Sequence, residues 1–262
     1  MTSVFLPGPA GALRVDDDGP TGGTGSLPVV FVHSLAGNAD QWSEQLAHLR
    51  SVRRALAIEL RGHGRSEAPR NGDYSITALA TDIAAVTEEL ELEQIFLVGH
   101  SLGGGVALAY AGAYPERIAG LLLLDPIGDG KQISPEAAQP LLDGLAADYL
   151  GTIRQYWTTI AGTNETVRQR LLADLDATPR QTVIGVFPEA LRFDPDPWLA
   201  SYGGPILSVV TPYNDQPFSL HRLGRGFPHR MVQGTGHWIQ LDQPDQFNAI
   251  LDEFLNQVRS KR

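Results

Sequence analysis

Residues 95–110 read IFLVGHSLGGGVALAY, and this stretch decides the fold of the chain. It opens with a short apolar run typical of a buried parallel strand and continues with helical periodicity. Between the two stands Gly99-His100-Ser101-Leu102-Gly103, a Gly-x-Ser-x-Gly sequence. Alone, such a match is equally typical of a glycine-rich turn with an inert serine. At a junction of strand and helix, it predicts a sharp turn that exposes the Ser101 hydroxyl above a sheet edge.

The alternation of strand and helix extends in both directions from Ser101. We expect buried strands at residues 28–33, 54–60, 94–99 and 117–125, and helices at residues 39–49, 76–92 and 102–114. Residues 3–6 and 12–15 predict an opening hairpin. Late in the chain we expect strands at residues 205–210 and 229–232 and helices at residues 218–223 and 246–258. The pattern predicts an α/β fold with a mostly parallel central sheet flanked by helices.

Residues 126–204 interrupt this alternation. Prolines divide the segment into short helical stretches, and no strand-like run occurs in it. We therefore expect a core formed by residues 1–125 and 205–262, and a helical cap, residues 126–204, inserted after the sixth strand. The aromatic residues of the cap either line an apolar pocket or simply pack the cap onto the core; they are Tyr149, Tyr156, Trp157, Phe187, Phe193 and Trp198.

The composition excludes several classes of protein. In 262 residues, 42% are hydrophobic and 19% charged, which is typical of a compact globular chain and not of a disordered or fibrous one. A net charge of −10 opposes binding to nucleic acid and to anionic membranes. The chain has no cysteine, which excludes disulfides, a thiolate nucleophile and cysteine-ligated metal sites.

The segment at the start of the chain does not have the pattern of a secretory signal. Residues 1–19 lack a basic start followed by a continuous apolar run. No apolar run in the chain approaches the ~18 residues that a membrane-spanning helix needs. We therefore expect a soluble cytoplasmic protein, either a monomer or a homodimer.

A serine hydroxyl needs a base to take its proton, and the chain offers seven histidines. Most stand where a packed or structural imidazole is expected: His33, His48, His63, His100, His221 and His229. His237 differs, because it lies in Gly234-Thr235-Gly236-His237-Trp238, a loop between the last predicted strand and the closing helix. It is the candidate base; the alternative is a loop histidine that caps the helix.

Several separate stretches of the chain resemble the α/β-hydrolase family. Residues 29–37, VVFVHSLAG, look like its oxyanion loop, residues 61–66, RGHGRS, like its Arg-Gly-His-Gly-x-Ser loop, and residues 234–237, GTGH, like its histidine loop. The resemblance implies an oxyanion hole formed by the backbone N–H groups of Leu35 and Leu102. It also implies a structural role for Arg61, His63 and Arg65.

Two positions depart from the pattern of that family. Ser34 stands where glycine is usual, and His-Ser-Leu is similar to the Asn-Ser-Leu-Gly run of enol-lactonases, a hint toward lactones. Glu59 replaces the commoner aspartate before the Arg-Gly-His-Gly loop.

The resemblance leaves the triad acid open between Asp215 and Asp125. The usual position of the acid is the ninth residue after Pro205, which is Asn214 and carries no charge. Asp215 is one residue late, and Thr211 replaces a glycine of that loop. A minority of the family places the acid after strand six, where Asp125 stands. Asp215 is slightly preferred; the alternative reading of Asp125 is a residue that turns the chain into the cap.

A serine and histidine of this kind predict acyl transfer on a small-molecule carboxylic ester or lactone, with no metal or organic cofactor. Carbon–carbon bond hydrolysis and cofactor-free perhydrolysis use the same residues and are the alternatives, followed by a ligand-binding protein without activity. An aspartate nucleophile, as in dehalogenases of this fold, is excluded by Ser101. Expected pocket residues are Ser34, His100, Tyr149, Trp157 and Trp238.

Overall fold

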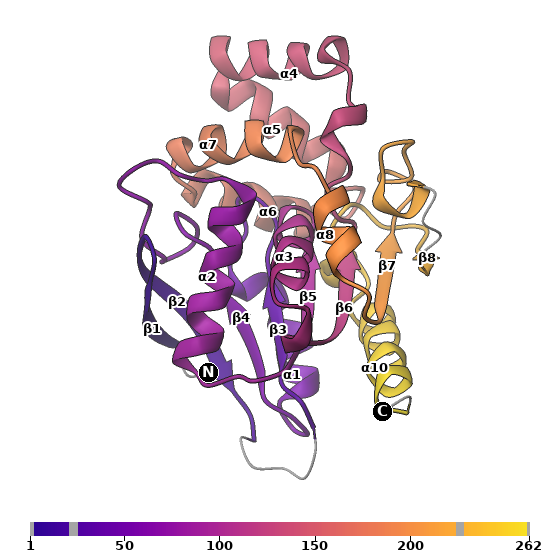
Figure 1. Cartoon of the computed structure of the whole chain (residues 1–262). Coiled ribbons are helices and arrows are strands. Elements are labelled where there is room, and N and C mark those ends of the chain that lie inside the picture. Colours follow the sequence, from indigo (N-terminus) through magenta and orange to yellow (C-terminus); the bar gives the residue numbers. More distant parts are fainter. Residues whose placement is uncertain (1–2, 21–25, 224–227, 261–262) are drawn as a thin grey trace.

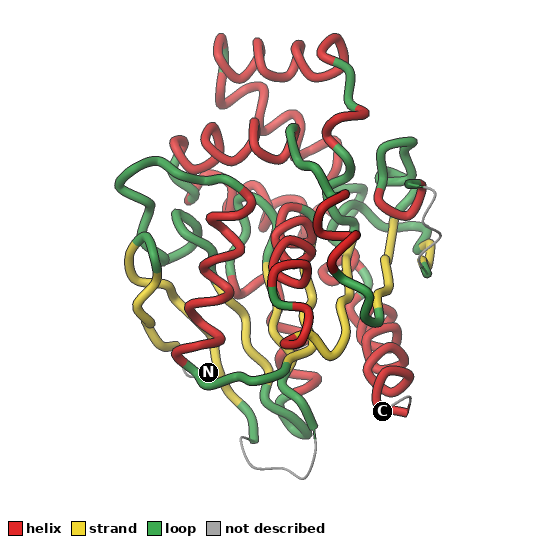
Figure 2. The backbone as a smooth tube through the Cα atoms, in the orientation of Figure 1, coloured by secondary structure: helices red, strands yellow, loops and turns green. Residues whose placement is uncertain are grey.

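An eight-stranded sheet forms the centre of the molecule in the computed structural model, which describes residues 3–20, 26–223 and 228–260 (Figures 1 and 2). The strands are β1 (Ser3–Gly8), β2 (Gly11–Asp18), β3 (Val29–Val32), β4 (Ala55–Ile58), β5 (Ile95–His100), β6 (Ile118–Leu124), β7 (Ile206–Val210) and β8 (His229–Met231). Their order is β1-β2-β4-β3-β5-β6-β7-β8. Strand β2 pairs antiparallel with β1 and β4, and the remaining pairs are parallel. The predicted α/β fold with a mostly parallel sheet is confirmed.

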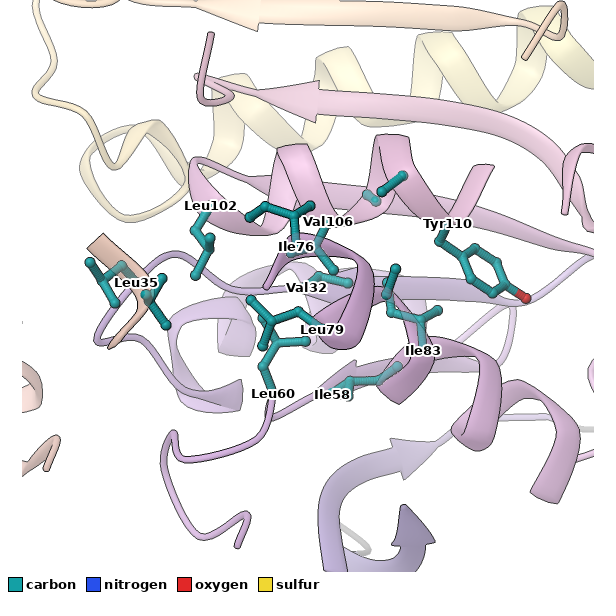
Figure 3. Packing of buried hydrophobic residues seen from close by; sticks show 14 of the residues in the cluster. Val32, Leu35, Ile58, Leu60, Ile76, Leu79, Ile83, Leu102, Val106 and Tyr110 are labelled. Carbon is teal, nitrogen blue, oxygen red and sulfur yellow. The ribbon is translucent and has the colours of Figure 1, made fainter. Parts of the chain in front are cut away.

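Helices cover both faces of the sheet, because each inner strand is apolar on both sides. In β3, Val30 and Val32 join the cluster that includes α2 (Ile76–Glu89) and α3 (Leu102–Ala113). Val29 and Phe31 point the other way, into the cluster that includes α1 (Ser43–Leu49) and α10 (Pro244–Ser260). Figure 3 shows the first of these clusters, with Leu35 and Leu102 at one end and Tyr110 at the other. Burial of each such side chain contributes about 1.5–3 kcal/mol, so the sheet is a firm base for the loops at its edge.

Four helices lie over the carboxyl edge of the parallel strands (Figure 1). They are α4 (Pro135–Ala147), α5 (Tyr149–Ile160), α6 (Glu165–Ala177) and α7 (Arg180–Leu191). The two ends of the segment that contains these helices lie side by side, since the Gly130 N–H donates to the Phe193 carbonyl at 2.8 Å.

The last helix of the expected insertion, α8 (Asp196–Ser201), lies apart from these four and packs against α3. A Cβ atom on Gly112 of α3 would lie 2.8 Å from the Cα of Trp198, so the two helices touch almost backbone to backbone. Residues 196–201 therefore pack with α3 in the helical layer on the sheet, and the boundary at residue 204 stays a prediction.

The remaining differences from the sequence prediction are local. Residues 39–49 form a 3-10 turn, η1 (Ala39–Trp42), followed by α1, and Asn38 caps the turn by accepting from the Asp40 N–H. The predicted helix at residues 218–223 is a single 3-10 turn, η4 (Leu220–Arg222). Short turns η2 (Pro115–Arg117), η3 (Gly130–Gln132) and α9 (Ile239–Asp242) were not predicted, because three or four residues carry no periodicity. Among the described helices, none is long and apolar enough to cross a membrane.

Candidate active site

Ser101 occupies a sharp turn between β5 and α3. Its φ and ψ are 53° and −115°, a conformation that costs a residue with a side chain about 1–3 kcal/mol. The turn is held by its backbone, because the Ser101 N–H donates to the Leu124 carbonyl at 2.9 Å and its carbonyl accepts from the Ile127 N–H at 3.1 Å. Strand six and the segment that follows it therefore fix the position of the serine.

Glycine is required on both sides of this turn. A Cβ atom on Gly99 would lie far inside van der Waals contact with the carbonyl oxygen of Gly103, and one on Gly103 would overlap the His33 carbonyl. The close approach of strand, turn and helix thus leaves no room for a side chain at either position.

Asp125 and His237 form a buried pair beside this turn. His237 Nδ1 lies 2.7 Å from Asp125 Oδ2, and both side chains are at most 8% exposed. Asp125 directly follows β6 with a positive φ of 42°, and it also accepts from the N–H and the hydroxyl of Thr211, each at 2.7 Å. These donors compensate for the removal of the carboxylate from water.

Of the two rival aspartates, the structure brings Asp125 to His237 and not Asp215, against the slight sequence preference. Asp215 accepts from Arg222 at 2.6 and 2.7 Å and from His221 at 2.9 Å. Hydrogen bonds from the Arg222 guanidinium, and then from His221, hold the pKa of Asp215 well below its usual range. Asp215 is therefore committed to a surface ion pair.

Asn214, which stands at the usual position of the acid, supports Asp125 indirectly. Its side-chain amide donates to the carbonyl of Pro126 at 2.9 Å, and its backbone N–H approaches the Thr211 hydroxyl at 3.4 Å. The loop after β7 therefore holds the carboxylate after β6. Thr211 is a site residue whose role the sequence did not reveal; the only signal was that it replaces a glycine.

The backbone of His237 is fixed on both sides. Its N–H donates to the carbonyl of Ile160, at the end of α5, at 2.8 Å. Its carbonyl accepts from His100 Nε2 at 2.9 Å. With Nδ1 on Asp125, the imidazole is oriented by three separate elements of the fold.

His33, His63 and His100 are fully buried and neutral. His33 donates from Nδ1 to the Ser34 carbonyl and accepts from the Leu60 N–H at Nε2, and burial lowers its pKa to about 4. Burial lowers the pKa of His63 to about 3 and that of His100 well below the usual value. These contacts agree with the structural roles expected for them.

The N–H groups of Leu35 and Leu102 are available to a ligand. Leu35 lies in a turn in which the Gly37 N–H donates to the Ser34 carbonyl at 3.0 Å and Ala36 has a φ of 54°. Within residues 3–20, 26–223 and 228–260, neither N–H has a hydrogen-bond acceptor. Ser34 stands where glycine is usual in the family. Its hydroxyl accepts from Trp238 Nε1 at 3.2 Å, so the serine side chain has a structural contact that glycine could not make.

A cavity of about 370 Å³ lies at this site. It is lined by Ser101, Asp125, His237, Leu35 and Leu102, and also by Ser34, Trp157 and Trp238, as expected. The upper wall includes residues of α4, α5 and α7, among them Tyr156 and Phe187.

Two expected pocket residues do not line this cavity. His100 lies behind His237, with the two ring centroids 4.7 Å apart. Tyr149 lines a separate hollow between α5 and α6, where the Arg180 guanidinium lies 5.1 Å from its ring centroid. Of the aromatic residues expected in the insertion, Phe193 and Trp198 are likewise absent from the lining.

Two tyrosines of the cavity wall lie close together, and only Tyr156 was among the aromatic residues considered from the sequence. The hydroxyl of Tyr156, on α5, lies 3.1 Å from that of Tyr213, in the loop after β7. The ring centroid of Tyr213 is 5.8 Å from that of His237.

In the part of the chain that the structure describes, no three histidine or acidic side chains are grouped so as to hold a metal ion.

Comparisons with known proteins agree with this architecture. A relative from Bacillus subtilis, with the provisional name 2-succinyl-6-hydroxy-2,4-cyclohexadiene-1-carboxylate synthase, is 26% identical over 93% of this chain and 94% of its own. A non-heme chloroperoxidase of Streptomyces lividans is 42% identical over 42% of this chain and 40% of its own.

Among solved structures, Est816, titled an N-acyl homoserine lactone degrading enzyme, has a TM-score of 0.83 at 23% identity and covers 96% of this chain and all of its own. This likeness concerns the fold. A family model described as alpha/beta hydrolase fold matches residues 28–172, more than half of the sequence. The chain belongs to the α/β-hydrolase family.

Proposed function

We propose that this α/β-hydrolase cleaves carboxylic esters or lactones through an acyl-serine, with Ser101 as nucleophile, His237 as base and Asp125 as acid. The observation that carries the proposal is the buried contact of 2.7 Å between His237 Nδ1 and Asp125 Oδ2, in the same cavity wall as Ser101. An imidazole oriented in this way has Nε2 left to accept the serine proton.

The proposed reaction has two halves. Ser101 Oγ attacks the carbonyl carbon while its proton passes to His237, and the oxyanion accepts from the N–H groups of Leu35 and Leu102. Collapse expels the alcohol, which takes the proton from the imidazolium. Water then attacks the acyl-serine, with His237 as base, and releases the acid and free Ser101. Asp125 stabilises the imidazolium in both halves.

The strained turn supports this assignment of the nucleophile. Strain at a residue with a side chain persists only where the surrounding structure imposes it, and it concentrates at functional sites. Here the serine stands at the start of α3, where helix N–H groups favour developing negative charge. Helices α4–α7 serve as the cap that closes the cavity from above.

The test is the change Ser101→Ala, assayed with p-nitrophenyl esters and acyl lactones. We expect kcat to fall by about 10³-fold or more while the melting temperature stays within a few degrees. Ser201→Ala, at the exposed end of α8, is the matched control and keeps full activity. A fluorophosphonate should label Ser101 alone; retention of a tenth of the activity, or labelling at another serine, contradicts the mechanism.

Perhydrolysis is the second candidate, favoured by the name of the Streptomyces lividans relative. In it, hydrogen peroxide replaces water in the second half and the product is a peracid. Halogenation that depends on peroxide and acetate, and that is lost in Ser101→Ala, would identify this reaction.

A further inference from the structure

The wall of the active-site cavity, as far as the structure describes it, carries no lysine or arginine. Among the described residues that line it there is no lysine, arginine or glutamate. Its titratable side chains are Asp125 and His237, which are paired to each other, and the tyrosines 156 and 213. The remaining polar side chains are serines, Asn214 and Gln216, and all of them are neutral.

Apolar side chains make up most of the rest of the wall. They come from the segment after β6 and from helices above the sheet, and include Ile127, Ile133, Leu141, Trp157, Phe187 and Leu191. A pocket of this kind favours an apolar group, because each methylene removed from water stabilises the complex.

Basic side chains on the neighbouring segments are already engaged. Lys131 binds Asp194 at 2.7 Å and Asp196 at 2.9 Å. Arg222 binds Asp215 through two of its nitrogens. A substrate carboxylate would therefore find no lysine or arginine among the described residues that line the cavity, and it would share the cavity with the carboxylate of Asp125.

We infer that the enzyme selects substrates with an uncharged, apolar acyl group and rejects those whose acyl group ends in a carboxylate. This inference rests on the proposed ester or lactone hydrolysis and names its substrate class. Burial of a carboxylate without a partner is strongly unfavourable, whereas burial of an apolar group is favourable.

Three esters of similar acyl length test the inference: p-nitrophenyl hexanoate, the mono-p-nitrophenyl ester of adipic acid, and its methyl p-nitrophenyl diester. The adipate monoester carries a terminal carboxylate, and the methyl diester has the same chain without the charge. We expect kcat/KM for the monoester to lie about 100-fold or more below both neutral esters. Low activity on both adipate esters would assign the effect to size and would overturn the inference.

A positive charge placed in the wall should reverse the selection. Ala138, on α4, is half-buried and lines the cavity. Ala138→Arg should raise kcat/KM for the monoester about 10-fold or more, because a buried ion pair replaces an unpaired charge. Ala138→Gln adds length without charge and should leave the preference unchanged.

The outcomes separate this inference from the function on which it rests. Equal kcat/KM on the three esters overturns the inference and leaves ester hydrolysis standing. The same holds if Ala138→Arg still hydrolyses hexanoate but keeps the wild-type preference for the hexanoate ester over the adipate monoester. Failure of the folded wild-type protein to hydrolyse any of the three overturns the proposed function, and the inference with it.

Discussion

Asp125 is the residue on which the proposed mechanism depends most directly after the serine. Asp125→Asn keeps the size and some hydrogen bonding of the side chain but removes the charge that stabilises the imidazolium. We expect kcat to fall by about 10²- to 10⁴-fold. Steady-state kinetics on a neutral ester measure the change.

Asp215→Asn is the matched control for that experiment. It breaks the ion pair with Arg222, which is exposed and contributes little to stability. Its kcat should stay close to that of the wild type. A dead Asp215→Asn beside an active Asp125→Asn would restore the assignment that the sequence slightly preferred.

The sequence predicted Ser101 and His237 because their signals are local. The glycines two residues before and two residues after the serine predict the turn, and the Gly-Thr-Gly-His loop predicts the position of the base. The acid has no such signal. Asp125 is 112 residues from His237, and both aspartates follow a predicted strand, so only the packing of strands β6 and β7 decides which one reaches the ring.

Helix α5 shows why pocket residues were harder to predict. Tyr149 and Tyr156 are both aromatic residues of this helix, but they lie about 10 Å apart along its axis at 1.5 Å per residue. Tyr156 reaches the cavity and Tyr149 does not. Helical periodicity gives the face of a residue and not its distance from the site.

The end of the same helix is packed directly against the loop of the base. A Cβ atom on Gly236 would overlap the carbonyl of Ala161, next to Ile160, whose own carbonyl accepts from the His237 N–H. Gly236→Ala should therefore displace His237 and lower kcat by about 10- to 100-fold, with a smaller change in KM.

Gly203→Ala is the control for this prediction, because a Cβ atom there meets nothing within 4 Å. It should match the wild type in kcat and in melting temperature. Wild-type kcat in Gly236→Ala would show that the base does not depend on its contact with α5.

At the scale of the whole molecule, buried histidines make stability depend on pH. The pKa of His33 is lowered by burial to about 4 and that of His63 to about 3, and the pKa of His100 is lowered as well. In the unfolded chain, each histidine binds a proton near pH 6.5. Below that pH the unfolded chain takes up protons that the folded chain does not. The free energy of unfolding therefore decreases as the pH is lowered from about 6.5 to about 4.

The slope is measurable by urea unfolding at several pH values between 7 and 5. Three such histidines give a fall of about 4 kcal/mol per pH unit near pH 5. His63→Asn should reduce the slope by about a third, whatever its effect on stability. A free energy of unfolding that stays constant from pH 7 to pH 5 would mean that these imidazoles are charged in the folded protein.

The hydrogen bond between Gly130 and Phe193 has a consequence for how such an enzyme can diversify. The chain leaves the core and returns to it at this one point. The residues between Gly130 and Phe193, here called the excursion, can therefore change in length and sequence without altering the course of the sheet strands. Substitution of the whole excursion would change what enters the cavity and leave Ser101 and Asp125 in place. A transplanted excursion would have to reproduce the contact of Ile160 with His237 in order to keep the base oriented.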